Sequence, residues 1–109
     1  MDNKTKNMLI GAMEECGKIT QYCSKAIKFG LFSHHANKDK TNGDEILIKY
    51  YRLQAIIEAL QHERVIPTYS MDYINNIKRD TLSKIKTQKN NHKGNLNDER
   101  KLRGTTRKR

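Results

Sequence analysis

The chain has 109 residues, a formal net charge of +10 and a hydrophobic fraction of 35%. This length gives room for one small domain, and a chain with so few apolar residues, no Trp and one Pro has little material for a self-sufficient core. We therefore expect a partner chain to supply part of the apolar contact. The sequence has no charged-then-apolar leader and no apolar run of about 18 residues, so it predicts neither a signal peptide nor a membrane span.

The positive charge is concentrated at the C-terminal end. Residues 1–88 carry 14 Lys/Arg against 10 Asp/Glu, or +4, whereas residues 89–109 carry 8 against 2, or +6. Because the last segment has almost no apolar residues, we expect residues 89–109 to form a flexible basic arm. Such an arm either aids solubility or contacts the phosphates of a nucleic acid, without aromatic side chains to stack on bases. Its candidate contact residues are Arg103, Arg107, Lys108 and Arg109.

The two cysteines, Cys16 and Cys23, are seven residues apart. On one helix this spacing is a rise of about 10.5 Å, which is too long for a disulfide. Both lie on the predicted apolar face, so we expect buried, reduced thiols. Reduced thiols are typical of an intracellular compartment and favour a cytoplasmic location.

Apolar residues at helical spacing predict a first helix from Lys4 to Phe29. Gly30 is suited to ending this helix, and Lys25 and Lys28 lie in its last turns, where cations favour the helix dipole. The polar residues 1–6 are expected to fray. The apolar stripe consists of Leu9, Ala12, Met13, Cys16, Ile19, Cys23, Ala26 and Ile27.

Residues 31–43 lack periodicity and are expected to form a loop. The adjacent His34 and His35 in this loop are too few to form a metal site without a third ligand. Either Thr41 or Asn42 can cap the next helix, with Glu45 at the capping-box position if Asn42 is the cap.

The second helix is predicted to run to about Glu63, before Val65-Ile66-Pro67. Its apolar stripe consists of Ile46, Leu47, Tyr50, Leu53, Ile56, Ile57 and Leu60. Ser70 can cap a third helix from Met71 to about Gln88, whose narrow stripe suits docking on a helix pair in the same or another chain. The expected fold of residues 1–88 is therefore all-α, with two long helices and a third, completed by assembly into a homodimer or higher oligomer.

Two strings of the chain are distinctive. Residues 14–31 read E-E-C-G-x-I-x-Q-x-x-S-K-A-I-K-F-G-L, and residues 53–60 read L-x-A-I-I-E-x-L, with Thr41-Asn42 between them. These strings resemble the MazG-like nucleotide pyrophosphohydrolases, in particular the short forms common in phage genomes, over about half of the chain. The resemblance implies an all-α fold in which helical pairs assemble into dimers or tetramers, and a host-cytoplasmic location if the protein is phage-encoded.

In that family the chemistry resides in an E-E-x-x-E motif and a later E-x-x-D motif. Their carboxylates, at i and i+3 on facing helices, hold a magnesium ion that activates the phosphate and an attacking water. In this chain the first motif falls on Glu14, Glu15 and Lys18, and the second falls on Lys49 and Arg52. Of the four usual ligand positions only Glu15 remains acidic, so the local charge changes from −4 to +2.

This exchange of acids for bases argues against catalysis. Two like charges about 4 Å apart at an effective dielectric near 20 repel by roughly 4 kcal/mol. A divalent ion among three cations would meet several such repulsions. We therefore expect no metal site, no cofactor and no catalytic residue, and the degenerate motifs favour a non-enzyme.

The favoured function is binding of phosphate-bearing ligands, either a nucleotide or a nucleic-acid backbone. Lys18, Lys49 and Arg52 would take the place of the metal's charge, and Lys25 and Lys28 would extend the patch.

Three alternatives remain open. The first is a structural or interaction protein, such as a phage or virion component, in which Glu14 and Glu15 pair across the helices with Lys49 and Arg52. Glu45 is also spaced to pair with Lys49 along the second helix. The second alternative is nucleic-acid binding by the basic arm. The third is residual magnesium-dependent pyrophosphohydrolase activity with displaced ligands.

Overall fold

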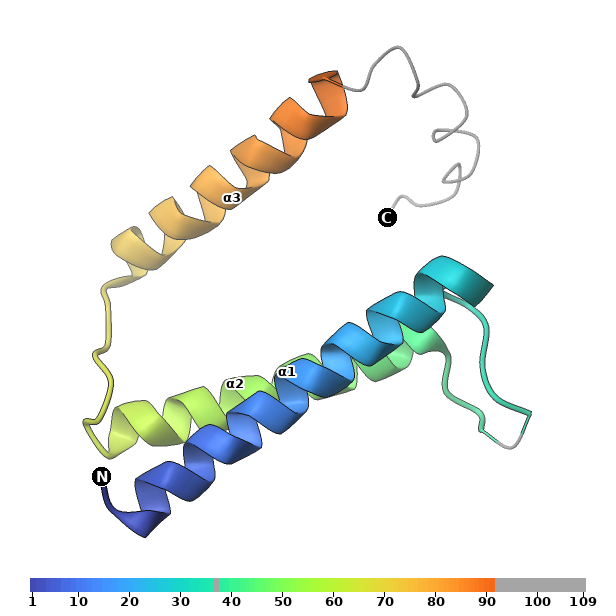
Figure 1. Ribbon diagram of the computed structural model, residues 1–109. Helices are drawn as coiled ribbons and strands as arrows, with labels where there is room; N and C mark the ends of the chain where they lie inside the picture. The colour runs from blue at the N-terminus through green and yellow to red at the C-terminus, as the bar shows by residue number, and fades with distance from the viewer. Residues whose placement is uncertain (37, 92–109) are drawn as a thin grey trace. The chain divides into compact units, whose positions relative to one another are not determined.

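The computed structural model of the chain describes residues 1–36 and 38–91, in which three α-helices follow one another (Figure 1). Helix α1 spans Asn3–Phe29, α2 spans Asn42–His62 and α3 spans Met71–Asn91. The described residues contain no strand, which confirms the all-α prediction. None of the helices in this part of the chain combines the length and apolar character that crossing a membrane requires.

The first compact unit, Met1–Thr68, is an antiparallel hairpin of α1 and α2 (Figure 1). Near one end Lys4 Nζ lies 2.9 Å from Glu63 Oε2. Further along, a Cβ atom on Gly11 would lie 3.4 Å from a methyl of Ile56. As residue numbers rise on α1 they fall on α2, so the two helices face each other along their whole length.

The second unit begins at Tyr69 and contains α3. Ser70 caps this helix as predicted, because its Oγ accepts a hydrogen bond of 3.1 Å from the backbone N–H of Tyr73. The helix continues to Asn91, so the first three residues of the predicted arm are helical and its remainder lies outside the described residues.

The start of α1 is ordered, and the expectation that residues 1–6 fray is wrong. Asp2 is the N-cap, and its carboxylate accepts a hydrogen bond of 2.7 Å from the N–H of Thr5. Thr5 is buried, and Lys4 forms the ion pair with Glu63. These two contacts hold the polar first turn against the end of α2.

The loop between α1 and α2 is closed by a capping box. Thr41 is the N-cap of α2: its hydroxyl accepts from the N–H of Asp44 at 3.0 Å, and the Asp44 carboxylate accepts from the N–H of Thr41 at 3.0 Å. Asn42 is therefore not the cap. Its side chain is buried and donates to the carbonyl of Gly30 at 3.0 Å, which ties the start of α2 to the end of α1.

Helix α2 ends at His62, within one residue of the predicted end at about Glu63 and before Val65-Ile66-Pro67. Arg64 adopts a left-handed backbone with φ of 62°. The N–H of Val65 reaches back to the carbonyl of Leu60 at 3.1 Å, and the N–H of Arg64 reaches Gln61 at 2.9 Å. This pair of bonds is a Schellman motif, in which glycine is the usual residue at the left-handed position.

The core of the hairpin is thin. Among the described residues, Leu60 is the one large side chain that is fully buried, and Tyr22 is the other buried apolar residue. Glu15 lies in the seam between the helices, with a side chain that is 12% exposed. The next residue, Cys16, points away from this seam and is exposed. The prediction of a buried thiol at Cys16 is therefore wrong, whereas Cys23 is half-buried.

Candidate functional site

Three lysine side chains gather around the buried ring of Tyr22. Lys25 on the same helix lies 4.8 Å from the ring centre, Lys49 on α2 lies 5.6 Å away, and Lys38 in the loop lies 6.0 Å away. Lys38 also donates a hydrogen bond of 3.4 Å to the Tyr22 hydroxyl. Ammonium groups at these distances are attracted to the ring's electron density. We call Lys25, Lys38 and Lys49 around Tyr22 the Tyr22 lysine cluster.

One buried carboxylate, that of Glu45, lies within this cluster. It accepts a hydrogen bond of 2.9 Å from Lys49, and both side chains are only 11% exposed. The hydrogen bond from Lys49 holds the pKa of Glu45 below its ordinary value, and the charges of Lys38 and Lys40 act in the same direction, against the effect of burial. Glu45 therefore neutralises Lys49.

The other two lysines of the cluster have no ion pair of their own, although the charge of Lys38 also acts on Glu45. Within the described part of the chain, neither Lys25 nor Lys38 forms an ion pair with a carboxylate. The cluster thus has a local excess of two positive charges beside a ring and a hydroxyl. Such an arrangement attracts an anion with several oxygen atoms.

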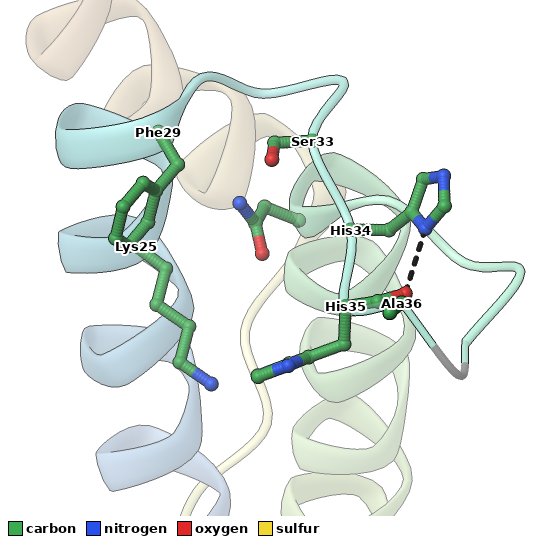
Figure 2. Close-up of a pocket in the computed structure, with 7 residues that line it drawn as sticks. Lys25, Phe29, Ser33, His34, His35 and Ala36 are labelled. Atoms are coloured by element: carbon green, nitrogen blue, oxygen red, sulfur yellow. Dashed lines mark hydrogen bonds between the residues drawn. The ribbon is translucent and has the colours of Figure 1, made fainter.

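A pocket of about 350 Å³ opens beside the cluster at the loop end of the hairpin (Figure 2). Figure 2 shows Lys25 and Phe29 on α1 along one side and the loop with His34 and His35 along the other. This volume is within the range of small-molecule sites. Ammonium and imidazole groups are suited to phosphate oxygens, and the Phe29 ring adds an apolar wall. The residues that line the pocket are Lys25, Phe29, Ser33, His34, His35, Ala36 and Asn42.

The structure places the predicted phosphate ligands in different surroundings. Lys25 and Lys49 both belong to the Tyr22 lysine cluster, although Lys49 is neutralised. Lys28 is exposed and lies 5.4 Å from the ring centre of Phe29, the aromatic wall of the pocket. Two of the five predicted ligands therefore line or adjoin the pocket without a compensating carboxylate, namely Lys25 and Lys28.

Of the former motif positions, Lys49 belongs to this cluster, whereas Glu14, Glu15, Lys18 and Arg52 do not. Lys18 pairs with Glu15 on its own helix, at 3.6 Å. Arg52 and Glu14 are exposed, and neither makes an ion pair with another described residue. The ion pairs at these positions therefore run along each helix, and the cross-helix pairs of the structural alternative are not formed. The predicted pair of Glu45 with Lys49 along α2 is present.

Glu15 is the acid that remains at the four usual ligand positions of the family motifs. Glu15 Oε2 faces Lys18, and its Oε1 is buried without a hydrogen-bond partner. Within residues 1–36 and 38–91, no three His, Cys, Asp or Glu side chains come together as a metal site would need. Magnesium prefers several oxygen ligands in octahedral geometry, so the donor set at Glu15 does not fit this ion.

Sequence reasoning missed Tyr22 and Lys38. Tyr22 lies three residues after Ile19 and four before Ala26, so helical spacing places it in the seam. Lys38 had no such signal, since a loop without periodicity does not reveal which way its side chains point. The arm residues Arg103, Arg107, Lys108 and Arg109 lie outside the described residues.

Comparison with known proteins finds no matching family model, no matching curated protein and no matching solved structure. The resemblance to the MazG-like family therefore depends on the motif residues alone.

Proposed function

We propose that this protein is a non-catalytic, MazG-like binder of phosphate-bearing ligands, and that its binding site is the Tyr22 lysine cluster with the adjoining pocket. The ligand is a nucleotide or another compound that presents several phosphate oxygens together. The observation that carries the proposal is the presence of Lys25 and Lys38 on one buried ring, with no carboxylate paired to either.

The chemistry of the pocket supports this assignment. Glu45 and Lys49 hold each other, so the pair leaves the charge balance unchanged, and Lys49 lies 5.6 Å from the centre of the Tyr22 ring. Lys25 reaches both the ring and the pocket, where His35 and the ring of Phe29 complete the wall. A polyphosphate would meet the lysines, and a planar group attached to it would meet Phe29.

Calorimetric titration with tripolyphosphate and with a nucleoside triphosphate, in EDTA, tests the proposal. We expect metal-free binding that weakens by about tenfold or more in Lys38→Glu, because a charge-assisted hydrogen bond contributes roughly 1.5–3 kcal/mol. The matched control is Lys84→Glu on α3, which makes the same change in net charge at an exposed position. Equal loss in both variants, or no binding by the native chain, would contradict the proposal.

The alternative functions give different outcomes in the same set of experiments. Gel shift of DNA or RNA that disappears on deletion of residues 89–109, with Lys38→Glu harmless, favours the basic arm. Hydrolysis of a triphosphate with magnesium favours residual enzyme activity. If neither phosphate nor nucleic acid binds, the protein is a structural or interaction component. Assembly into a homodimer or higher oligomer is a further part of the proposed architecture.

A further inference from the structure

Both phenylalanines of the chain lie at the loop end of the hairpin, and both are open to solvent. Phe29 is the last residue of α1, and Phe32 follows in the turn after it. Ile27 and Phe32 are 89% and 84% exposed, and Phe29 and Leu31 are each more than half exposed. Large, exposed apolar side chains therefore occupy four of six consecutive positions. We call Ile27, Phe29, Leu31 and Phe32 the apolar tip.

Positive charge is in excess around the apolar tip. Residues 25–49 contain five lysines against three Asp/Glu, a balance of +2, and one of these acids, Glu45, is already paired with Lys49. Lys28 lies 5.4 Å from the ring centre of Phe29, so a positive charge adjoins the tip itself. An apolar tip with a basic surround is complementary to anionic headgroups that cover an apolar layer.

The apolar tip is too small for a stable contact with another protein. The end of a pair of helices, each about 10 Å across, offers roughly 200 Å². A stable protein interface needs roughly 800 Å² from each partner. A second copy would also present the same positive charges. A lipid bilayer has neither restriction, because binding to its surface combines a modest apolar area with attraction to anionic lipids.

The Tyr22 lysine cluster lies at a suitable height above the apolar tip. With α1 along the membrane normal, helical rise places the Cα atom of Lys25 about 6 Å above that of Phe29, and that of Tyr22 about 10 Å above it. The headgroup layer on each side of a bilayer is about 5–8 Å thick. Figure 2 shows Lys25 and Phe29 along the same wall of the pocket. This wall therefore leads from the level of the acyl chains to the level of the headgroups.

We propose that the loop end of the hairpin binds the surface of an anionic phospholipid bilayer, with the apolar tip among the acyl chains and a headgroup phosphate at the Tyr22 lysine cluster. This inference rests on the proposed phosphate site and names a lipid headgroup as the source of the phosphate. Lys25 and Lys38 donate hydrogen bonds to the phosphate oxygens. The contact is confined to the membrane surface, so it needs no helix long and apolar enough to cross the bilayer.

Co-sedimentation of the full chain with vesicles tests the proposal. We expect binding to phosphatidylcholine vesicles that contain about one fifth phosphatidic acid, and none to phosphatidylcholine alone. Phe32→Ser should weaken this binding by at least about fivefold, because it removes apolar area without changing the charge. Met13→Ser is the matched control, since Met13 is an exposed apolar residue of α1 outside the tip. Equal binding by Phe32→Ser and the native chain would overturn the proposal, because attraction to the basic residues would then suffice.

Tryptophan fluorescence gives a second readout, because the chain has no Trp of its own. In Phe32→Trp, emission should shift to shorter wavelength when phosphatidic acid vesicles are added, since the indole enters an apolar layer. In Met13→Trp the emission should stay at the wavelength of the free protein. No shift in Phe32→Trp, or equal shifts in both variants, would overturn the insertion of the tip.

Calorimetric titration with tripolyphosphate separates this inference from the proposed function. Phe32→Ser should bind tripolyphosphate like the native chain, whereas Lys38→Glu should lose both tripolyphosphate and vesicle binding relative to Lys84→Glu. A native chain that binds tripolyphosphate but not the vesicles would overturn the membrane contact and leave the proposed function standing. Binding of neither would overturn both. Self-association that Phe32→Ser abolishes, without vesicle binding, would assign the tip to a second copy and also overturn the proposal.

Discussion

Lys49 and Glu45 form a hydrogen-bonded ion pair of 2.9 Å in which both side chains are only 11% exposed. The same Lys49 ammonium lies 5.6 Å from the centre of the Tyr22 ring on the facing helix. Lys49 occupies the first position of the family's second motif, where the resemblance implies an acid that holds magnesium. In this chain Lys49 instead compensates a buried carboxylate and contacts the other helix, so its role at this position is structural.

Removing this lysine should destabilise the hairpin. Lys49→Met leaves the Glu45 carboxylate buried without its partner, which should lower the free energy of unfolding by about 2 kcal/mol. Urea denaturation followed by circular dichroism measures the change at a fixed protein concentration. Arg52→Met is the matched control, because Arg52 is exposed and makes no ion pair with a described residue. A loss in the control equal to that in Lys49→Met would contradict this account.

The pH dependence of stability should reflect the same pair. The hydrogen bond from Lys49 holds the pKa of Glu45 below the ordinary value of 4.5 that it regains on unfolding. The stabilisation is therefore fully present above that ordinary value and is lost as pH falls through the lower folded pKa.

Thermal unfolding between about pH 3 and pH 6 measures this effect, with the Tm of the native chain falling toward acid. Glu45→Gln should flatten part of the fall. The rest of the fall in Tm should remain in this variant. Asp2 and Asp44 also have lowered pKa values, because of their capping hydrogen bonds with Thr5 and Thr41. An unchanged acid slope in Glu45→Gln would show that the pair does not stabilise the fold.

The end of α2 offers a stabilising substitution. Arg64 has a φ of 62°, and a non-glycine residue in the left-handed region costs roughly 1–2 kcal/mol relative to glycine. Arg64→Gly should therefore raise the free energy of unfolding by about 0.5–1 kcal/mol, net of the greater freedom of glycine in the unfolded chain. In Arg52→Gly, within α2, the same exchange should lower stability by about 1 kcal/mol. Changes of the same sign at both positions would rule out the Schellman motif as the cause.

The partly buried carboxylate of Glu15 should lower the stability of the hairpin. Its Oε1 is buried without a hydrogen-bond partner, and an unsatisfied buried polar atom costs about 1–3 kcal/mol. Glu15→Met should stabilise the hairpin by about 1 kcal/mol, whereas Glu14→Met, at an exposed neighbouring position, should be close to neutral. Destabilisation by Glu15→Met would mean that this carboxylate has a partner in the native protein.

Helical periodicity identified all three helices to within a few residues, because the apolar spacing along each one is regular. The ends were harder to predict. Thr41 and Asn42 are both good capping residues, and only the folded loop reveals that Asn42 reaches Gly30 instead. The ordered first turn depends on Glu63, which is 59 residues away from Lys4 in the chain. Long-range contacts of this kind leave no local signal.

The sequence predicts only some residues of the candidate site, because the site also depends on contacts between residues that are distant in the chain. The motif positions Glu15 and Lys49 have largely buried side chains, and the expected patch includes Lys25, which lies 4.8 Å from the Tyr22 ring centre. Whether a lysine is neutralised depends on its neighbours in space, as the pairs of Lys18 and Lys49 show. Lys38 enters the site from an irregular loop whose path is set by tertiary contacts, so its position could not be predicted from spacing.

The central claim is that a phosphate-bearing ligand binds at the Tyr22 lysine cluster, not at the other former motif positions Glu15, Lys18 and Arg52. Amide chemical shifts of the isotope-labelled full chain, recorded during titration with tripolyphosphate in EDTA, test it most directly. Binding at the cluster predicts saturable shifts centred on residues 33–36 and 38–42 and on the amides of Tyr22, Lys25 and Glu45. Shifts centred on Glu15, Lys18 and Arg52, or no saturable shifts, would contradict it.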